Sequence, residues 1–484
     1  MRRTKIVCTI GPATASEERL EQLMRAGMNV ARLNFSHGTQ QEHAVVIERL
    51  RAIAARLGAT IAILQDLQGP KIRTGSLQDK QPVMLIDSAP ITITTRDIPG
   101  TAAMISTTYK QLPQDVKPGD RILLNDGILE LRVLDIHETE VHCLVVHGGT
   151  LGEHKGINLP GVAVSAPALT QKDRADLRFG VMHDVDYVAL SFVRRPEDIL
   201  EAKQYIHELQ LERSEQKKKN LLPIPLIAKL EKPEAIARLE DILEVTDGVM
   251  IARGDLGVEM AAEKVPLLQK HIISRCHELG LPVITATQML ESMVTNPRPT
   301  RAEVSDVSNS ILDKTDAVML SAETATGAYP IEAVQMMVQI ARETEAGNRT
   351  AQQPTRQRLT QARAVSHAAR ALSEEASVKA IVVFTRSGNS AHLISKDRPR
   401  VPILAYTPSE RVRCQLALWW GVWPHCMELQ GTTEKLIEAV EHRLLEEKLI
   451  QKGEYVVIMG GLPIARWART NFVKLHRVRM ADEP

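Results

Sequence analysis

Residues 225–257 read PLIAKLEKPEAIARLEDILEVTDGVMIARGDLG, and this stretch decides the fold. It starts with a short apolar run, Pro225–Ala228, passes through a segment of helical length, and reaches a second apolar run, Val249–Ile251. Two strand-like runs joined in this way are typical of a parallel βαβ unit, because parallel neighbours need a long crossover connection. The same alternation recurs through much of the chain.

Eight short apolar runs alternate with amphipathic stretches between residues 5 and 320. One such stretch, Ser16–Ala26, begins with a capping residue followed by Glu17 and Glu18, which favour the positive end of a helix. Eight strand–helix units predict a (β/α)8 TIM barrel, although the pattern separates it poorly from a doubly wound sheet. The expected strands are Lys5–Ile10, Asn29–Leu33, Ile61–Gln65, Tyr187–Leu190, Pro225–Ala228, Val249–Ile251, Pro282–Thr285 and Ala317–Leu320.

Two segments interrupt this alternation. From Ile72 to Ile157 the helical period disappears, and short alternating runs with turn signals such as Asn125-Asp126-Gly127 predict an inserted all-β lid domain. A polar stretch near Gly347–Pro354 indicates a linker, and the strands and helices after it predict a separate α/β domain. The expected division is a barrel from 1–71 and 158–345, a β lid from 72–157, a linker from 346–360, and a C-terminal effector and oligomerisation domain from 361–484.

Length and charge exclude several classes of protein. The 484 residues carry 60 basic and 59 acidic side chains, so no global field draws the chain to nucleic acid or to anionic lipid. No signal-peptide core and no run of about 18 apolar residues occurs, which predicts a cytoplasmic protein without membrane partners. The five cysteines are widely spaced and form no C-x-x-C pair, so we expect reduced thiols rather than disulfides or a zinc site.

Polar and charged residues follow the apolar runs instead of lying at random. In a parallel barrel these positions converge at the carboxyl-end face, where such barrels carry their active sites. Solvated strand ends explain any single residue, but they explain poorly a set of carboxylates, cations and hydroxyls from seven strands. The set comprises Arg32, Asn34, Ser36, Asp66, Ser191, Lys229, Glu231, Asp255, Thr287, Gln288, Ser321 and Glu323.

These side chains suit phosphoryl transfer, which needs carboxylate ligands for Mg²⁺ and cations for phosphoryl oxygens, but no covalent nucleophile. Glu231 and Asp255 suit one Mg²⁺, and Mn²⁺ accepts the same oxygen ligands. Lys229 lies two positions before Glu231, so on a strand both point to one face; a simple ion pair is the alternative. Neither a P-loop motif nor a G-x-G-x-x-G motif occurs, so the β insertion is the natural cover for a nucleotide.

Seven motifs resemble those of the pyruvate kinase family, in the family's order and across nearly the whole chain. The resemblance implies Mg²⁺-dependent transfer of the phosphoryl group of phosphoenolpyruvate to ADP, giving pyruvate and ATP in the last step of glycolysis. Each motif is weak alone, whereas the ordered set is highly specific. The motifs are TIGPA at Thr9–Ala13, RLNFSHG at Arg32–Gly38, GPKIRT at Gly69–Thr74, KGINLPG at Lys155–Gly161, ARGDLG at Ala252–Gly257, TQMLESM at Thr287–Met293 and LSAET at Leu320–Thr324.

The resemblance assigns roles around the phosphoryl group. Glu231 and Asp255 would hold the Mg²⁺ that binds phosphoenolpyruvate. Lys229 and Arg32 would stabilise the transferring group, mainly by electrostatics.

The resemblance also assigns the carboxylate end of the substrate. Gly254, Asp255 and Thr287 would cradle the carboxylate, with Ser191 near by. Thr287, water and the segment Ser321–Glu323 form the family's candidate route for protonating the enolate.

Five further residues stand where the family contacts the nucleotide and its second metal ion. These are Asn34, His37, Arg73 and Lys155, together with Asp126 on the β lid. Without the resemblance, His37 would be an ordinary loop histidine.

One position departs from the pattern of many members, which need K⁺ and carry a Glu where this chain has Lys71. A tethered ammonium could supply the positive charge that K⁺ supplies elsewhere, among ligands similar to Asn34, Ser36, Asp66 and Leu67. We therefore expect activity without added K⁺.

The C-terminal domain contains TRSGNSA, which is similar to the loop that binds a phosphorylated effector in regulated members. A Gly-flanked hydroxyl loop entering a helix suits a phosphate, although a simple helix cap is the alternative. Asn389 stands where several relatives have Arg, so the identity of the effector stays open between a sugar phosphate and a nucleotide monophosphate. The expected effector residues are Thr385, Arg386, Ser387, Gly388, Asn389 and Ser390, and the resemblance further implies a homotetramer.

Two rival functions stay open on the sequence alone. Another phosphoenolpyruvate-using barrel, of the carboxyl-transfer or aldol type, would share the carboxylate pair but would not need Lys155 or a lid. A regulatory paralogue without activity is disfavoured by the presence of Lys229, Glu231, Asp255 and Thr287.

Overall fold

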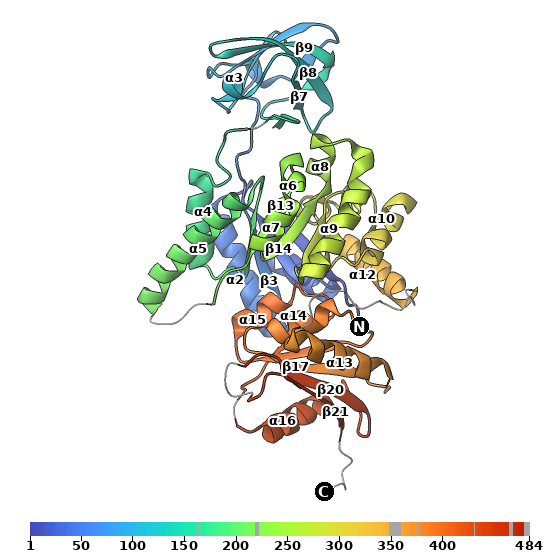
Figure 1. Cartoon of the computed structure of the whole chain (residues 1–484). Coiled ribbons are helices and arrows are strands. Elements are labelled where there is room, and N and C mark those ends of the chain that lie inside the picture. Colours follow the sequence, from blue (N-terminus) through green and yellow to red (C-terminus); the bar gives the residue numbers. More distant parts are fainter. Residues whose placement is uncertain are drawn as a thin grey trace.

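The computed structural model describes residues 1–162, 164–217, 222–347, 360–375, 377–429, 431–463 and 468–478. Figure 1 shows three bodies stacked along one direction, with a small β domain above the barrel and the C-terminal domain below it. All five cysteines are free, and all except Cys426 are buried, as expected.

Eight parallel strands close into a barrel in the order β1-β16-β15-β14-β13-β12-β3-β2, which confirms the predicted fold class over the doubly wound sheet. Almost every strand residue is buried, because packed side chains fill the interior and helices cover the outside. The strands are β1 (Lys5–Ile10), β2 (Val30–Asn34), β3 (Ala62–Asp66), β12 (Tyr187–Leu190), β13 (Leu226–Leu230), β14 (Gly248–Ala252), β15 (Val283–Ala286) and β16 (Ala317–Leu320).

The expected ends of five strands were wrong by one or two residues. Arg32, Asn34, Asp66 and Lys229 lie inside their strands, where the sequence had placed them directly after the apolar runs. The parallel ladder continues through them, for example between Asn34 and Asp66. Only backbone groups enter the ladder, so a polar side chain does not end a strand.

Helices surround the barrel, and several start with side-chain caps. The Ser16 hydroxyl accepts from the backbone N–H of Arg19, as the sequence predicted, and Thr39 forms a reciprocal capping box with Glu42. None of the helices in the described part of the chain is long and apolar enough to cross a membrane. They are α1 (Glu17–Ala26), α2 (Gln40–Leu57), α4 (Gln171–Met182), α5 (Pro196–Lys217), α6 (Pro233–Ala237), α7 (Leu239–Val245), α8 (Arg253–Glu259), α9 (Val265–Leu279), α10 (Arg301–Leu312), α11 (Ala322–Ala325) and α12 (Pro330–Gly347).

The β domain is inserted between β3 and β12 and has its own apolar core. Its six-stranded sheet has the order β11-β7-β8-β9-β5-β6, and β10 pairs with β4 beside it. The elements are β4 (Val83–Leu85), β5 (Pro90–Thr94), β6 (Met104–Ser106), α3 (Leu112–Asp115), β7 (Arg121–Leu124), β8 (Leu129–His137), β9 (Glu140–His147), β10 (Gly149–Leu151) and β11 (Ile157–Asn158).

The C-terminal domain is a five-stranded sheet in the order β19-β18-β17-β20-β21, with only β21 antiparallel to its neighbour. The sequence predicted the three central strands and missed both edges, β19 and β21. Residues 348–359 of the expected linker lie outside the described residues. The elements are α13 (Gln361–Glu375), β17 (Ala380–Phe384), α14 (Asn389–Lys396), β18 (Ile403–Thr407), α15 (Glu410–Leu416), β19 (Val422–Cys426), α16 (Thr433–Glu446), β20 (Tyr455–Gly460) and β21 (Phe472–Arg477).

A buried ion cluster joins the C-terminal domain to the amino-end face of the barrel. Asp316, directly before β16, contacts Lys396 Nζ at 2.6 Å and Arg398 Nη2 at 2.8 Å. The two cations also lie over the rings of Trp419 and Trp420 respectively. The domain interface is therefore fixed by charge and by aromatic packing.

Candidate active site

Lys229 is the centre of a buried cluster at the carboxyl-end face of the barrel. Its ammonium lies 2.9 Å from Glu231 Oε1 and 3.2 Å from Asp66 Oδ1, and it donates to Ser191 Oγ at 2.7 Å. Ser191 directly follows β12, which lies between β13 and β3 in the barrel, so it bridges the strands that carry Lys229 and Asp66. The predicted meeting of Lys229 and Glu231 is confirmed.

Arg32 reaches the same cluster from β2. Its Nε donates to Asp66 Oδ2 at 2.6 Å, and its Nη1 donates to Thr9 Oγ1 at 2.9 Å. Within the described residues, Arg32 Nη2 has no hydrogen-bond partner. Asp66 therefore holds two cations, Lys229 and Arg32, and one of them keeps an unused donor.

The charges of the cluster support one another. Burial alone would lower the pKa of Lys229, but Asp66 and Glu231 outweigh it, so that pKa is raised. Burial would raise the pKa of Asp66, but Lys229 and Arg32 outweigh it, so that pKa is lowered. Both groups therefore stay charged at neutral pH.

Glu231 is 2% exposed, and both of its oxygens are oriented. Oε1 faces Lys229, and Oε2 accepts from the backbone N–H of Phe192 at 2.8 Å. The pKa of Glu231 is raised, first by burial and then by repulsion from Asp255, against the attraction of Lys229. A second carboxylate close enough to repel Glu231 makes a pair that suits one divalent cation.

Asp255 lies in the first turn of α8 and is exposed. No group of three or more His, Cys, Asp or Glu side chains suited to a metal occurs in the described part of the chain. Glu231 and Asp255 together supply two carboxylates, and a divalent ion such as Mg²⁺ takes one or two protein carboxylates and completes its shell with substrate and water oxygens.

Thr287 and Gly254 form the edge of the site next to Asp255. The Gly254 N–H donates to Thr287 Oγ1 at 2.8 Å, and Thr287 Oγ1 donates to the Ala286 carbonyl at 2.6 Å. A Cβ atom at residue 254 would lie 3.4 Å from Thr287 Oγ1, which is an ordinary van der Waals distance. The position of the threonine is therefore set here by its hydrogen bond with the Gly254 N–H.

Ser321 and Glu323 contact each other, not Thr287. Glu323 is fully buried and accepts from the backbone N–H groups of Ser321 and Leu290, at 2.7 and 3.1 Å. Burial raises the pKa of Glu323. Ser321 Oγ is buried and has no hydrogen-bond partner within the described residues.

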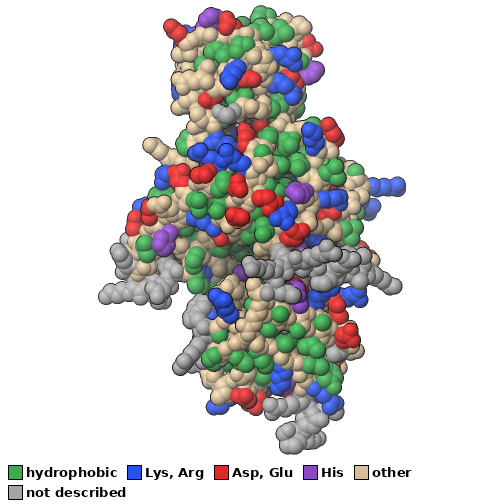
Figure 2. All heavy atoms as spheres, in the orientation of Figure 1, with side chains coloured by type: hydrophobic (Ala, Val, Ile, Leu, Met, Phe, Trp, Pro, Cys, Tyr) green, Lys and Arg blue, Asp and Glu red, His purple; other side chains and the backbone are tan. Residues whose placement is uncertain are grey.

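A cleft between the β lid and the barrel holds Asp126, Asp255 and Lys71, with Lys232 beside them. Figure 2 shows Lys and Arg side chains gathered where the lid meets the barrel, with Asp and Glu side chains near by. Asp126 is exposed and has a left-handed backbone, with φ 57°. This cleft is the expected nucleotide region.

The other expected nucleotide residues, Asn34, His37, Arg73 and Lys155, are not among the residues that line this cleft. Asn34 Oδ1 accepts from the Ser36 N–H at 3.1 Å, which shapes the turn before His37. The pKa of His37 is lowered, first by burial and then by the positive charges of Lys71, Arg73 and Arg32. Arg73 and Lys155 lie on adjacent segments, since Arg73 pairs with Gly156 and the Lys155 N–H donates to Thr74 Oγ1.

In the described part of the chain, no hydrogen bond or ion pair joins the Lys71 side chain to Asn34, Ser36 or Asp66. Its pKa is lowered, first by desolvation and then by Arg73, while Asp255 and Asp126 act in the opposite direction. Its charge therefore acts on the carboxylates of the cleft.

Comparison with known proteins decides the family. A model of the pyruvate kinase barrel domain matches residues 1–334, and a model of the pyruvate kinase alpha/beta domain matches residues 363–476. The chain belongs to the pyruvate kinase family. It is therefore a kinase enzyme with a TIM barrel.

Individual relatives agree with this assignment. A pyruvate kinase from Staphylococcus haemolyticus is 48% identical over 99% of this chain and 81% of the relative. One from Geobacillus stearothermophilus is 45% identical over 98% of this chain and 80% of the relative. A crystal structure of a Cryptosporidium parvum pyruvate kinase superposes with a TM-score of 0.90 at 36% identity, covering 99% of this chain and 96% of that one.

The loop similar to the family's effector loop lines a cavity of about 710 Å³ in the C-terminal domain. The Gly388 N–H donates to Thr385 Oγ1 at 2.9 Å, and Gly388 caps α14 with φ 90°. Ser390 shares a hydrogen bond with Thr470 across the cavity, and Arg386 donates to the Leu429 carbonyl. Ser387 and Asn389 line the same cavity.

Sequence reasoning missed four residues that shape the site. Phe192 has a left-handed backbone, with φ 55°, and aims its N–H at Glu231. Lys232 pairs with Glu259 at 2.6 Å, and Asn158 of the lid also donates to Glu259, at 2.7 Å. Lys232 directly follows Glu231, and this adjacency was the available signal.

Proposed function

We propose that this enzyme transfers the phosphoryl group of phosphoenolpyruvate to ADP, giving pyruvate and ATP, with Mg²⁺ as its divalent ion. The observation that supports the proposal most strongly is the Lys229 cluster. It sets two cations and two carboxylates together at the carboxyl-end face, where barrel enzymes act.

Glu231 and Asp255 are the residues that would hold Mg²⁺, and Mn²⁺ fits the same oxygen donors. When bound, the ion neutralises phosphoryl and enolate oxygens as a Lewis acid. Phe192 keeps one oxygen of Glu231 oriented by its N–H.

Lys229 and Arg32 would contact the equatorial phosphoryl oxygens. A unit charge about 4 Å away contributes on the order of 4 kcal/mol at an effective dielectric of 20, which corresponds to about three decades of rate. Arg32 Nη2 is the donor available for this contact, because Asp66 and Thr9 occupy the other two nitrogens.

The carboxylate of phosphoenolpyruvate would lie against the Gly254 and Asp255 backbone and Thr287, with Ser191 near by. When the P–O bond breaks, the enolate of pyruvate forms and needs one proton at its methylene carbon. Thr287 is the nearest proposed hydroxyl for a water-linked delivery, and Ser321 and Glu323 would support the adjoining segment.

ADP would bind in the cleft under the lid, near Asn34, His37, Arg73 and Lys155, and Asp126 would approach as the lid closes. Attack by its terminal phosphate oxygen on phosphorus replaces the enolate leaving group. Closure would exclude water and so limit hydrolysis.

A coupled assay tests the proposal by following ADP-dependent formation of pyruvate from phosphoenolpyruvate. We expect turnover that requires Mg²⁺ and is lost with EDTA. Consumption of phosphoenolpyruvate without ADP would favour the carboxyl-transfer or aldol-type barrel, and no consumption at all would favour the regulatory paralogue.

We also propose that Lys71 makes the enzyme independent of K⁺, because its charge acts on the carboxylates of the cleft. Turnover in sodium-only buffer should change less than about twofold on adding KCl, and Lys71→Glu should acquire a clear K⁺ requirement. Strong stimulation of the wild type by KCl would contradict this.

The cavity beside Thr385–Ser390 would bind a phosphorylated small-molecule effector, either a sugar phosphate or a nucleotide monophosphate. Such a ligand should lower the phosphoenolpyruvate concentration that gives half-maximal rate, and Ser387→Ala should weaken this effect. We further propose a cytoplasmic homotetramer, which light scattering of the purified protein can test.

A further inference from the structure

Two consecutive residues after β15 have left-handed backbones although neither is glycine. Thr287 has φ 65° and Gln288 has φ 52°. Each such residue costs roughly 1–2 kcal/mol, and the conformation persists only where surrounding contacts enforce it. The bend turns both of their carbonyl groups toward the same side, and it places the Thr287 hydroxyl on the Gly254 N–H.

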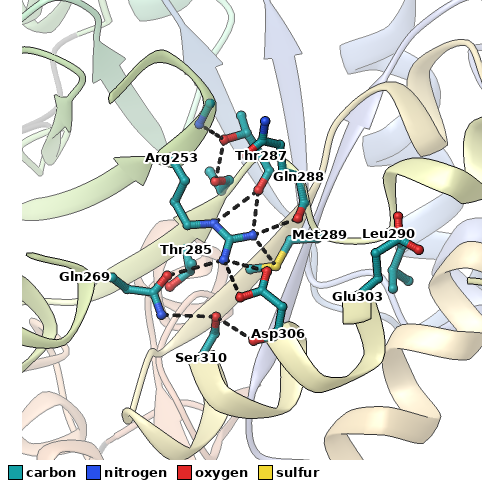
Figure 3. A network of polar contacts seen from close by, with 12 residues as sticks. Arg253, Gln269, Thr285, Thr287, Gln288, Met289, Leu290, Glu303, Asp306 and Ser310 are labelled. Carbon is teal, nitrogen blue, oxygen red and sulfur yellow. Dashed lines mark hydrogen bonds and ion pairs between the residues drawn. The ribbon is translucent and has the colours of Figure 1, made fainter. Parts of the chain in front are cut away.

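Arg253 occupies the inside of this bend, as Figure 3 shows. Its Nη2 donates to the Thr287 and Gln288 carbonyls, at 2.8 Å each, and its Nε donates to the Thr287 carbonyl at 3.3 Å. The side chain is 8% exposed. Residues 253 and 254 therefore hold Thr287 from two directions. The Arg253 side chain binds the backbone carbonyl of Thr287, and the Gly254 N–H binds the Thr287 hydroxyl.

The guanidinium is itself anchored to two helices. Nη1 donates to Asp306 of α10 at 2.8 Å and lies 3.4 Å from Gln269 Oε1 of α9. Gln269 in turn donates to Ser310. The bend is thus fixed to the helical wall by a planar group with several donors, a geometry that lysine cannot reproduce.

We infer that Arg253 is a positioning residue for the reaction, which sets the orientation of the Thr287 hydroxyl at the substrate. This inference rests on the proposed function, because Thr287 acts there on the carboxylate and the enolate. Arg253 need not touch the substrate. Without its donors, two partly buried carbonyls lose their partners and the strained bend can relax, so the hydroxyl moves away from the Gly254 N–H.

The test separates proton transfer from folding. Exchange of pyruvate methyl protons with D₂O, followed by NMR in the presence of Mg²⁺ and ATP, reports enolate protonation alone. For Arg253→Met we expect both kcat and this exchange to fall about 100-fold per folded molecule, as for a misplacement of about 1 Å. Arg253→Lys should recover part of the exchange rate.

Asp306→Asn is the matched control, because it removes the charge of the Asp306 side chain, which is 41% exposed, but keeps an oxygen that can accept from Nη1 and leaves the carbonyl contacts. Its turnover and exchange should stay within about twofold of the wild type. If Arg253→Met does not fold, Arg253→Lys carries the test with an expected loss of about tenfold. The inference is overturned if a folded Arg253 variant exchanges the methyl protons of pyruvate at the wild-type rate. It is also overturned if Asp306→Asn lowers this rate as much as the Arg253 substitution does.

The outcome also separates this inference from the proposed function. An active wild type with an equally active Arg253 variant overturns the positioning role alone. An inactive wild type overturns the proposed function and this inference with it.

Discussion

Two buried ion clusters lie at opposite ends of the same barrel. The cluster at the mouth joins Lys229 and Arg32 to Asp66 and Glu231, and the cluster at the base joins Lys396 and Arg398 to Asp316. Both clusters bury cations beside carboxylates, at a desolvation cost that protein contacts must offset. Their remaining contacts differ.

At the base, the cations are directed at other parts of the protein. Lys396 also donates to the Leu281 carbonyl and Arg398 to the Lys314 carbonyl, and both lie over tryptophan rings. Burial would raise the pKa of Asp316, but the two cations outweigh it and that pKa is lowered. This cluster is built to join two domains.

At the mouth, the cluster also presents groups toward a cleft. Among the residues that the structure describes, Arg32 Nη2 has no hydrogen-bond partner, and Asp255 extends the set of carboxylates to the exposed cleft. The comparison teaches that buried charge alone does not identify an active site. An unused donor does not identify one either, because Arg398 Nε at the base has no hydrogen-bond partner among the described residues. The mouth differs in having a further carboxylate, Asp255, at the cleft under the lid.

The largest expected effect is at the mouth. Glu231→Gln should lower turnover at fixed Mg²⁺ by about 10²–10³-fold, because one of two metal-binding carboxylates is lost, and higher Mg²⁺ should restore part of the rate. The thermal midpoint should change little, because burying the charged carboxylate of Glu231 carries a desolvation cost that a neutral glutamine does not have. Equal Mg²⁺ dependence in variant and wild type would show that Glu231 is not a ligand.

At the base, Asp316→Asn should reduce the free energy of unfolding by about 3–5 kcal/mol, because two buried cations lose their counter-ion. Turnover per folded molecule should stay near the wild-type value. Urea unfolding measures the change, and Glu240→Gln, which removes the exposed ion pair with Arg275, should cost less than about 1 kcal/mol. Equal effects of the two substitutions would remove the distinction between buried and exposed pairs.

A smaller effect concerns His392, which stacks on Trp419 near the base cluster. Burial, with a contribution from Lys396, lowers the pKa of His392 to about 3. The unfolded chain takes up a proton near pH 6.5 and the folded chain does not, so stability is complete above pH 6.5 and falls below it. The titration of His392 alone should lower the free energy of unfolding by about 2 kcal/mol between pH 7 and pH 5.

His392→Phe removes this titration and keeps an aromatic ring on Trp419. The variant should therefore lose less stability than the wild type between pH 7 and pH 5, as measured by urea unfolding at each pH. Parallel losses in the two proteins would mean that His392 is protonated in the folded state.

The sequence predicted the eight strands because buried parallel strands are continuous apolar runs, and eight of them alternate with helical stretches. That alternation alone separated a closed barrel poorly from a doubly wound sheet. It missed β19 and β21 because they are the edges of the C-terminal sheet. β19 contains Pro424 and His425, and β21 exposes Lys474 and Leu475, so neither shows an apolar run.

The meeting of Lys229 and Glu231 followed from the two-residue period of a strand. The hydrogen bonds from Arg253 to the Thr287 carbonyl could not be predicted from the sequence. No glycine marks the left-handed bend, and the two residues are distant in sequence. The absence of a hydrogen bond or ion pair between Lys71 and Asp66 in the described part of the chain also depends on three-dimensional placement, which residue types alone do not give.

The central claim is that the mouth cluster performs the chemistry and the base cluster joins the domains. Turnover per folded molecule in Lys229→Met and in Lys396→Met tests it most directly, with pyruvate formation as the readout. The account predicts a loss of about three decades for Lys229→Met and a near-normal value for Lys396→Met, whose thermal midpoint should fall instead. Near-normal turnover in Lys229→Met would contradict it.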